Sequence, residues 1–316
     1  MTEGPNRADS GRSHETDGGV TTTGYANVTE PTDVAEAPEV TESTDEQDSS
    51  ALRQIATVAG MEFRLSVRNR WAVALAALFT LFASLIVGFG ASSVGPVRAD
   101  AVIVSMASLA TYLLPLAALV FGFDAVVGAE ERGWLDIVFA LPVSRARVVV
   151  GSYLGRAVTL VAATSIGFGI GGILLFSVAS SADTALYATF LLGSVALGLG
   201  FLAVGVFVSS VVGEKTHALG AALLVWVWFV FGHDLLALGL VAGSELPQSA
   251  LSVMVLSNPV SVFRVFVLSG IDSTGGGLAT VVGESTLSMP LLAVAATVWV
   301  VVPVAAAARA VRHRSL

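Results

Sequence analysis

The chain has 316 residues, of which 54% are hydrophobic and 13% are charged, and its mean hydropathy is +0.81. Soluble domains contain about 25% charged residues, so this composition excludes an ordinary soluble protein and indicates an integral membrane protein. The formal net charge of −8 gives no reason to expect nucleic acid as a partner, and the absence of cysteine excludes disulfides and thiolate metal sites.

Residues 1–50 hold most of the negative charge. They carry 12 acidic side chains against Arg7 and Arg12, whereas residues 51–316 carry 12 acidic and 14 basic side chains. The segment contains almost no large apolar side chains, so it cannot bury enough surface to offset the entropy of ordering. We predict a disordered acidic N-terminal tail over residues 1–50 and one transmembrane domain over residues 51–316.

Residues 51–71 intersperse apolar side chains with Glu62, Arg64 and Arg68. A mixed helix of this kind suits the boundary between lipid and water better than the hydrocarbon core. We predict an N-terminal interfacial helix here.

Six stretches are long and apolar enough to cross a membrane, which requires about 20 residues for a core of roughly 30 Å. The predicted spans are residues 71–90, 101–123, 158–179, 186–212, 218–241 and 289–308. The expected fold is therefore an all-α integral membrane protein with six transmembrane helices.

The basic residues orient these spans, because cytoplasmic loops carry an excess of arginine and lysine. One side of the membrane holds Arg64, Arg68, Arg70, Arg132, Arg145, Arg147, Arg156, Lys215, Arg309, Arg312 and Arg314. The other side holds only Arg98 and Arg264. Both termini are predicted to be cytoplasmic. The single lysine among 16 basic residues is typical of a GC-rich prokaryote, whose plasma membrane is the expected location.

Residues 242–288 contain one more apolar run, which Asn258 and Pro259 interrupt. Proline removes a backbone donor, and irregular backbone at membrane depth is tolerated only where protein or water covers it. We predict a re-entrant outer hairpin before the last span. A seventh span would move the basic C-terminus outside, against the charge distribution.

The longest loop on the predicted cytoplasmic side, residues 123–156, contains a charged pair, Glu130 and Glu131, just before Gly133. An apolar helical surface then runs to a proline, and Ser144 is placed to cap the next helix. This arrangement is typical of an element that docks onto a cytoplasmic partner. An ordinary interfacial helix flanked by positive-inside charges is the alternative.

This loop resembles that of the ABC-2 type permeases, in which a Glu-rich, Gly-containing turn precedes a Leu-Leu-x-x-Pro-x-Ser-Arg-like run. The residues that carry the resemblance are Glu130, Glu131, Gly133, Leu135, Leu141, Pro142, Ser144, Arg145 and Gly151. Residues 226–240 and 256–268 resemble, within that family, the permease of the transporter that assists maturation of the copper centre of nitrous oxide reductase. Trp134 stands where threonine is usual, and Ser152 where a lysine often follows Gly151.

The resemblance implies a homodimer of permeases, two copies of a cytoplasmic ATPase subunit, and an extracytoplasmic accessory protein in the copper-enzyme case. The residues assigned to ATPase docking are Glu130, Glu131, Gly133, Leu141, Pro142, Ser144 and Arg145. ATP is expected to bind the partner, because a P-loop needs G-x-x-x-x-G-K-[ST] and the sole lysine follows Glu214 instead of glycine. We therefore expect no catalytic residue and no cofactor in this chain.

Two other functions compete with this interpretation. An intramembrane metalloprotease of the prenyl-endopeptidase type shares the Glu130-Glu131 pair and the spacing from Phe229 to His233. However, Leu135 occupies the position of the required arginine, and neither histidine of the fifth-span region, His217 or His233, is followed four residues later by Asn or Asp. A secondary transporter would need ionisable residues inside its spans or paired broken helices.

Only His233 and Asp234 meet the first of those requirements. Such a pair is expensive in hydrocarbon unless it faces a partner or water, so we assign it to a pore or a dimer seam. A polar contact between helices of one bundle is the alternative. One histidine and one aspartate are too few for a metal site.

Overall fold

The structure, a computed structural model, describes residues 44–92, 98–131, 133, 144–179, 182–243, 247–268 and 287–312, with the backbone alone for residues 44–50. Positions 1–43 of the predicted acidic tail lie outside the described residues.

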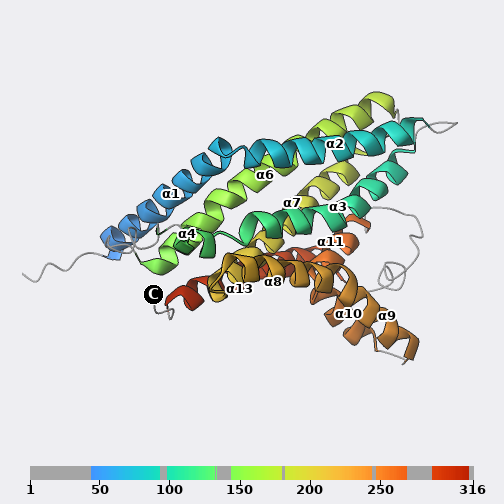
Figure 1. The fold of residues 1–316 in the computed structure, drawn as a ribbon. Helices are drawn as coiled ribbons and strands as arrows, with labels where there is room; N and C mark the ends of the chain where they lie inside the picture. The colour runs from blue at the N-terminus through green and yellow to red at the C-terminus, as the bar shows by residue number, and fades with distance from the viewer. Residues whose placement is uncertain are drawn as a thin grey trace, which may run out of the picture. The chain divides into compact units, whose positions relative to one another are not determined.

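The described residues form helices and no strand. The helices, labelled in Figure 1, are α1 (Thr44–Arg68), α2 (Trp71–Ala91), α3 (Ala99–Gly122), α4 (Val127–Glu131), α6 (Arg145–Val178), α7 (Thr184–Val211), α8 (Lys215–Val227), the π-helical turn η1 (Trp228–Gly232), α9 (His233–Gly243), α10 (Gln248–Leu256), α11 (Pro259–Leu268) and α13 (Met289–Arg312). Six helical stretches are long and apolar enough to cross a membrane. The prediction of an all-α membrane protein with six spans is confirmed.

The third span is longer than predicted. Helix α6 begins at Arg145, because the Ser144 side chain accepts a hydrogen bond from the Arg147 backbone N–H and so caps the helix as expected. The sequence prediction began this span at residue 158, where the continuous apolar stretch starts. Packing against another helix stabilises the additional turns of α6 that precede residue 158.

That other helix is α1. Along the bundle, α6 packs on α1 and α2, α7 packs on α3 and α13, and α6 and α7 also contact each other (Figure 1). Gly155 of α6 lies so close to α1 that an added Cβ would be 2.7 Å from the Glu62 Cβ and closer still to the Ala59 carbonyl oxygen. Helix α1 therefore buries one face against α6, a contact that the interfacial-helix prediction did not include.

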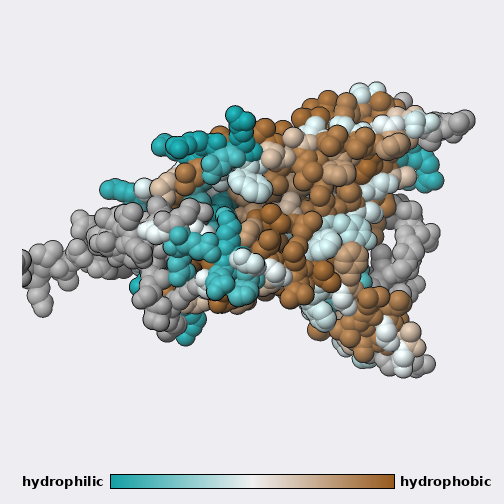
Figure 2. All heavy atoms as spheres, viewed as in Figure 1, coloured by the Kyte–Doolittle hydropathy of each residue, from teal (hydrophilic) through white to brown (hydrophobic). Residues whose placement is uncertain are grey.

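The spans differ in how much surface they bury. The apolar window of α7 is 67% buried, whereas those of the α8–α9 span and of α13 are each 17% buried. Apolar side chains cover most of the visible surface, while hydrophilic side chains gather over α1 and beside α4 (Figure 2). Spans with so much apolar surface need lipid or another protein chain around them.

The predicted helix break is also present. Helices α10 and α11 meet at an angle of 108° around Asn258. The Asn258 Oδ1 accepts from the Val260 N–H and caps α11, and Pro259 occupies the first helical position, where its missing N–H costs nothing. The Asn258 Nδ2 donates to the Phe229 carbonyl in the π-helical turn. The break is confirmed, while the return of the chain to the same side of the membrane stays a prediction.

Candidate functional site

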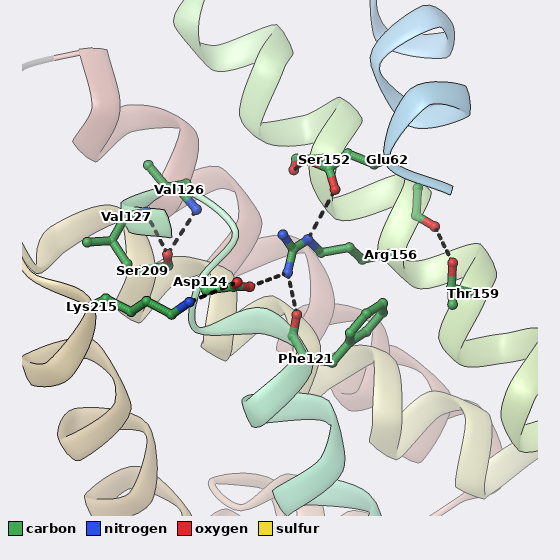
Figure 3. Close-up of polar contacts among 11 residues, drawn as sticks. Glu62, Phe121, Asp124, Val126, Val127, Ser152, Arg156, Thr159, Ser209 and Lys215 are labelled. Atoms are coloured by element: carbon green, nitrogen blue, oxygen red, sulfur yellow. Dashed lines mark hydrogen bonds and ion pairs between the residues drawn. The ribbon is translucent and has the colours of Figure 1, made fainter. Parts of the chain in front are cut away.

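Arg156 is the centre of a buried group of charges (Figure 3). Its Nη1 donates to the Asp124 Oδ1 at 2.8 Å and to the Phe121 carbonyl at the end of α3. Its Nε lies 3.5 Å from the Glu62 Oε2, and its guanidinium carbon lies 5.6 Å from the centre of the Phe121 ring. One side chain of α6 therefore contacts both α1 and the end of α3.

Glu62 is the buried partner on α1, with only 10% of its side chain exposed. Besides the Arg156 contact, its Oε1 accepts a hydrogen bond of 2.8 Å from the Ser152 hydroxyl. A buried carboxylate is tolerated only when it is paired and hydrogen-bonded. The close approach of α1 to α6 at Gly155 lets the Glu62 side chain reach both partners.

Asp124 extends the group toward the fifth span. One of its oxygens bonds Arg156, and the other lies 3.7 Å from the Lys215 Nζ at the start of α8. The Lys215 ammonium also lies 5.9 Å from the centre of the Phe123 ring. We call Glu62, Asp124, Arg156 and Lys215 the polar cluster.

The short helix α4 is attached to the same region at both of its ends. The Ser209 hydroxyl of α7 accepts hydrogen bonds from the Val126 and Val127 backbone N–H groups, at 2.9 and 3.1 Å. At the other end, the Glu131 Oε1 accepts from the Lys215 backbone N–H at 2.9 Å. Ser209 therefore caps α4, and Glu131 caps α8.

The structure describes both ends of the predicted docking loop. Glu130 and Glu131 end α4, and Gly133 follows with φ of +66°, a conformation that favours glycine. Ser144 and Arg145 begin α6. Leu141 and Pro142 lie outside the described residues. The docking role of all seven residues stays a prediction.

The polar cluster and the two caps connect α4 with the neighbouring helices. Ser209 and Glu131 join α4 to α7 and α8. Asp124, which lies just before α4, contacts Arg156 of α6, which in turn pairs with Glu62 of α1. Within the described residues, no three His, Cys, Asp or Glu side chains are placed to hold a metal ion.

Sequence reasoning missed this cluster. Glu62 was assigned to an interfacial helix and Arg156 to the positive-inside charge, while Asp124 and Ser209 were not selected. One signal was available, because Arg156 directly precedes a stretch without any charged residue up to Asp183. A charge so close to a long apolar helix needs a buried partner.

The structure places His233 and Asp234 in a second polar group. Asp234 pairs with Arg264 of α11, and the His233 Nε2 lies 3.2 Å from the Ser257 Oγ. The Arg264 side chain, predicted only as an outer-side charge, is thus the partner of an aspartate on α9. A role at a pore or dimer seam stays a prediction for His233 and Asp234, and Asn258 and Pro259 form the neighbouring helix break.

The residues of the metalloprotease hypothesis do not come together. Glu131 contacts Lys215 at the start of the fifth span, whereas His233 lies further along that same span. At a rise of about 1.5 Å per residue, the two positions are roughly 27 Å apart. They cannot share one metal ion.

Comparison with known proteins gives a consistent result. Residues 56–315 match the family described as ABC-2 family transporter protein. The probable ABC transporter permease protein NosY of Pseudomonas aeruginosa is 34% identical over 267 residues, which cover 81% of this chain and 95% of that protein. A protein of the same name from Stutzerimonas stutzeri is 33% identical over 257 residues, covering 78% and 92%.

Proposed function

The chain belongs to the ABC-2 family of transporter proteins, and on that premise we propose that it is a permease subunit that ATP hydrolysis by a separate cytoplasmic ATPase drives. The observation that carries the proposal is the attachment of α4, at the start of the predicted docking loop, to α7 and α8.

A helix of five residues is too short to be stable alone, so α4 depends on its neighbours. Its first N–H groups are bound by Ser209, and its last residue, Glu131, binds the start of α8. When the ATPase pulls on the loop, α4 moves together with α7 and α8. The polar cluster passes the same displacement to α6 and α1.

The other end of the loop enters α6 directly at Arg145. This helix has 34 residues and is therefore about 51 Å long, enough to cross the bilayer and project beyond it. Helix α1 packs on its projecting part through Gly151 and Gly155. Docking of the ATPase at the loop thus acts directly on α6, a long helix that spans the membrane.

The proposed transporter contains two permeases and two ATPases, with both permease termini in the cytoplasm and ATP bound by the ATPase alone. The weakly buried spans α8–α9 and α13 supply apolar surface for a second copy and for lipid. The resemblance to the nitrous oxide reductase maturation permease, and the two relatives named NosY, support a role in copper-enzyme maturation with an extracytoplasmic accessory protein.

The docking test uses the chain co-expressed with its ATPase and reconstituted in nanodiscs. Glu131→Ala, Pro142→Ala and Arg145→Ala are compared with Glu214→Ala, which removes an exposed carboxylate beside α8. We expect the three loop variants to lower permease-dependent ATP turnover roughly fivefold or more, the lower end of a typical coupling free energy. Normal complex formation and turnover in all three would refute docking through this loop.

The maturation role needs a separate measurement in the source organism. Deletion of the gene should leave nitrous oxide reductase present but without its copper-centre absorption spectrum. A normal spectrum in the deletion strain would remove the copper-enzyme role and leave the permease assignment unaffected.

A further inference from the structure

A cavity of about 380 Å³ lies between α3, α9, α10 and α11. Its volume falls in the range of small-molecule sites, roughly 300–1,000 Å³. Val104, Leu251 and Val267 contribute apolar walls, while His233 and Asp234 lie together on one side. The π-helical turn η1 ends directly before His233, and such turns occur frequently at functional sites.

The hydrogen bonds around His233 determine which of its nitrogens is available. The Ser257 hydroxyl donates to the Met254 carbonyl at 2.8 Å, so its oxygen accepts from the His233 Nε2 at 3.2 Å. In a neutral imidazole with this hydrogen bond, the ring proton is on Nε2 and Nδ1 carries a lone pair. This nitrogen is buried in a side chain that is 9% exposed, and it has no hydrogen-bond partner among the described residues.

Asp234 presents a second acceptor beside it. Its Oδ2 pairs with Arg264, which balances the carboxylate charge. Its Oδ1 lies 3.9 Å from the His233 Nδ1, too far for a direct hydrogen bond, and is likewise buried without a hydrogen-bond partner among the described residues. Two acceptors at this separation suit one group that donates to both of them.

Two more hydroxyl groups of the wall have the same polarity, while Tyr112 and Ser261 also line the cavity. Ser108 and Thr111 donate to the carbonyls of Val104 and Ala107 in their own helix, at 2.8 and 3.0 Å. Their oxygens therefore offer lone pairs toward the cavity that they line. Arg264 also lines the cavity, and its Nη1 binds Asp234. The acceptors among these groups favour a ligand with hydrogen-bond donors.

From these contacts we propose that the cavity binds the primary amino group of a small amphiphile between the His233 Nδ1 and the Asp234 Oδ1. A primary amino group has at least two N–H donors, which can satisfy both atoms at once, whereas an alcohol has only one. The apolar body of the ligand lies against Val104, Leu251 and Val267. This inference does not depend on how the ATPase docks.

The test measures saturable binding of octylamine to the purified full-length chain in nanodiscs by isothermal titration, with octanol and octanoate as probes of equal chain length. We expect octylamine to bind at least about tenfold more tightly than either, because it alone offers two N–H donors to the acceptor pair. His233→Leu should abolish this preference. His217→Leu, at a histidine with 73% of its side chain exposed, should retain it.

A second variant protects the test against misfolding of His233→Leu. Ala107→Leu fills the cavity from α3 without changing a polar group, and it should also eliminate octylamine binding. Equal binding of octylamine and octanol, a preference for octanoate, or an undiminished preference in both variants would each overturn the proposal. A zinc ion that binds alone and excludes octylamine would indicate a metal site instead and would overturn it as well.

Discussion

Arg156 determines whether the buried carboxylate of Glu62 has a counter-charge. Replacing it by methionine leaves the Glu62 side chain, 10% exposed, without its ionic partner. Removal of one member of a buried pair typically costs 3–5 kcal/mol, so we expect Arg156→Met to lower the free energy of unfolding by about 3 kcal/mol. Titration with SDS in mixed micelles measures this change.

An exposed pair supplies the control for that experiment. Arg98 binds Asp100 at 3.1 Å with 74% of the arginine side chain exposed, and such surface pairs contribute about 0–1 kcal/mol. Arg98→Met should therefore change stability little. Equal losses in the two variants would mean that Arg156 acts through packing or helix propensity, and not through its buried charge.

The double substitution Glu62→Met with Arg156→Met distinguishes an effect on folding stability from an effect on coupled ATP turnover. Buried ion pairs can often be replaced by apolar residues without loss of stability, so the double variant should recover most of the lost free energy. Coupled ATP turnover should stay low, because α6 no longer holds α1 and Asp124 through charge. Full recovery of turnover would show that the polar cluster serves stability alone.

Ser209 also stabilises the fold, because its hydroxyl is the acceptor for two backbone N–H groups. Ser209→Ala removes the acceptor of two N–H groups, those of Val126 and Val127, and we expect a loss of about 2 kcal/mol. Thr159→Val removes another fully buried hydroxyl, but one that only donates to the Gly155 carbonyl of its own helix. This control leaves no N–H group without its acceptor, so it should cost no more than about 1 kcal/mol in the same SDS titration.

Among the helices, the contact between α1 and α6 depends on glycine. Gly155→Ala would place a Cβ 2.7 Å from the Cβ of Glu62. Helix α1 must then move away from α6, which weakens the ion pair between Glu62 and Arg156. Overpacking of this kind costs about 1–3 kcal/mol. Gly169→Ala in the same helix meets no atom within 4 Å and should be neutral or stabilising, since alanine favours helix. Thermal unfolding of both variants in detergent compares the two positions.

The spans and the helix break could be predicted from the sequence, but the ion pair between α1 and α6 could not. The six spans follow from hydropathy, because a membrane requires continuous apolar helices, and the break at Asn258 and Pro259 follows from local backbone chemistry. The pairing of Glu62 with Arg156 depends instead on two helices far apart in the sequence. Neither residue carries a local pattern that names the other, so only the packed structure brings them together.

For the molecule as a whole, the polar cluster and the cavity divide the bundle into two regions. The cluster joins α1, α3, α6 and α8 near the docking loop, whereas the cavity lies further along the spans, where α3 meets α9 and α11. Helix α3 and the α8–α9 span each run from the polar cluster to the cavity. A displacement at the loop can thus reach the cavity through α3 and the α8–α9 span without a separate relay.

The absence of cysteine makes the topology directly testable, because single cysteines can be introduced without altering any native one. In intact cells, a membrane-impermeant maleimide should label Arg98→Cys and Ser288→Cys from outside. It should label His217→Cys only after permeabilisation, since the distribution of basic residues predicts that this loop is cytoplasmic. Arg98 and His217 are both strongly exposed, so accessibility to the reagent differs only by side of the membrane.

Ser288→Cys decides the role of the bent pair α10–α11, which precedes it in the chain. If the pair turns back as a re-entrant hairpin, the chain enters α13 from the outer side and Ser288→Cys is labelled in intact cells. If the pair crosses the membrane as a seventh span, Ser288 lies inside and the C-terminal arginines of α13 lie outside. Protection of Ser288→Cys, with Arg98→Cys still labelled, would therefore contradict six spans and place the basic end of α13 against the charge rule.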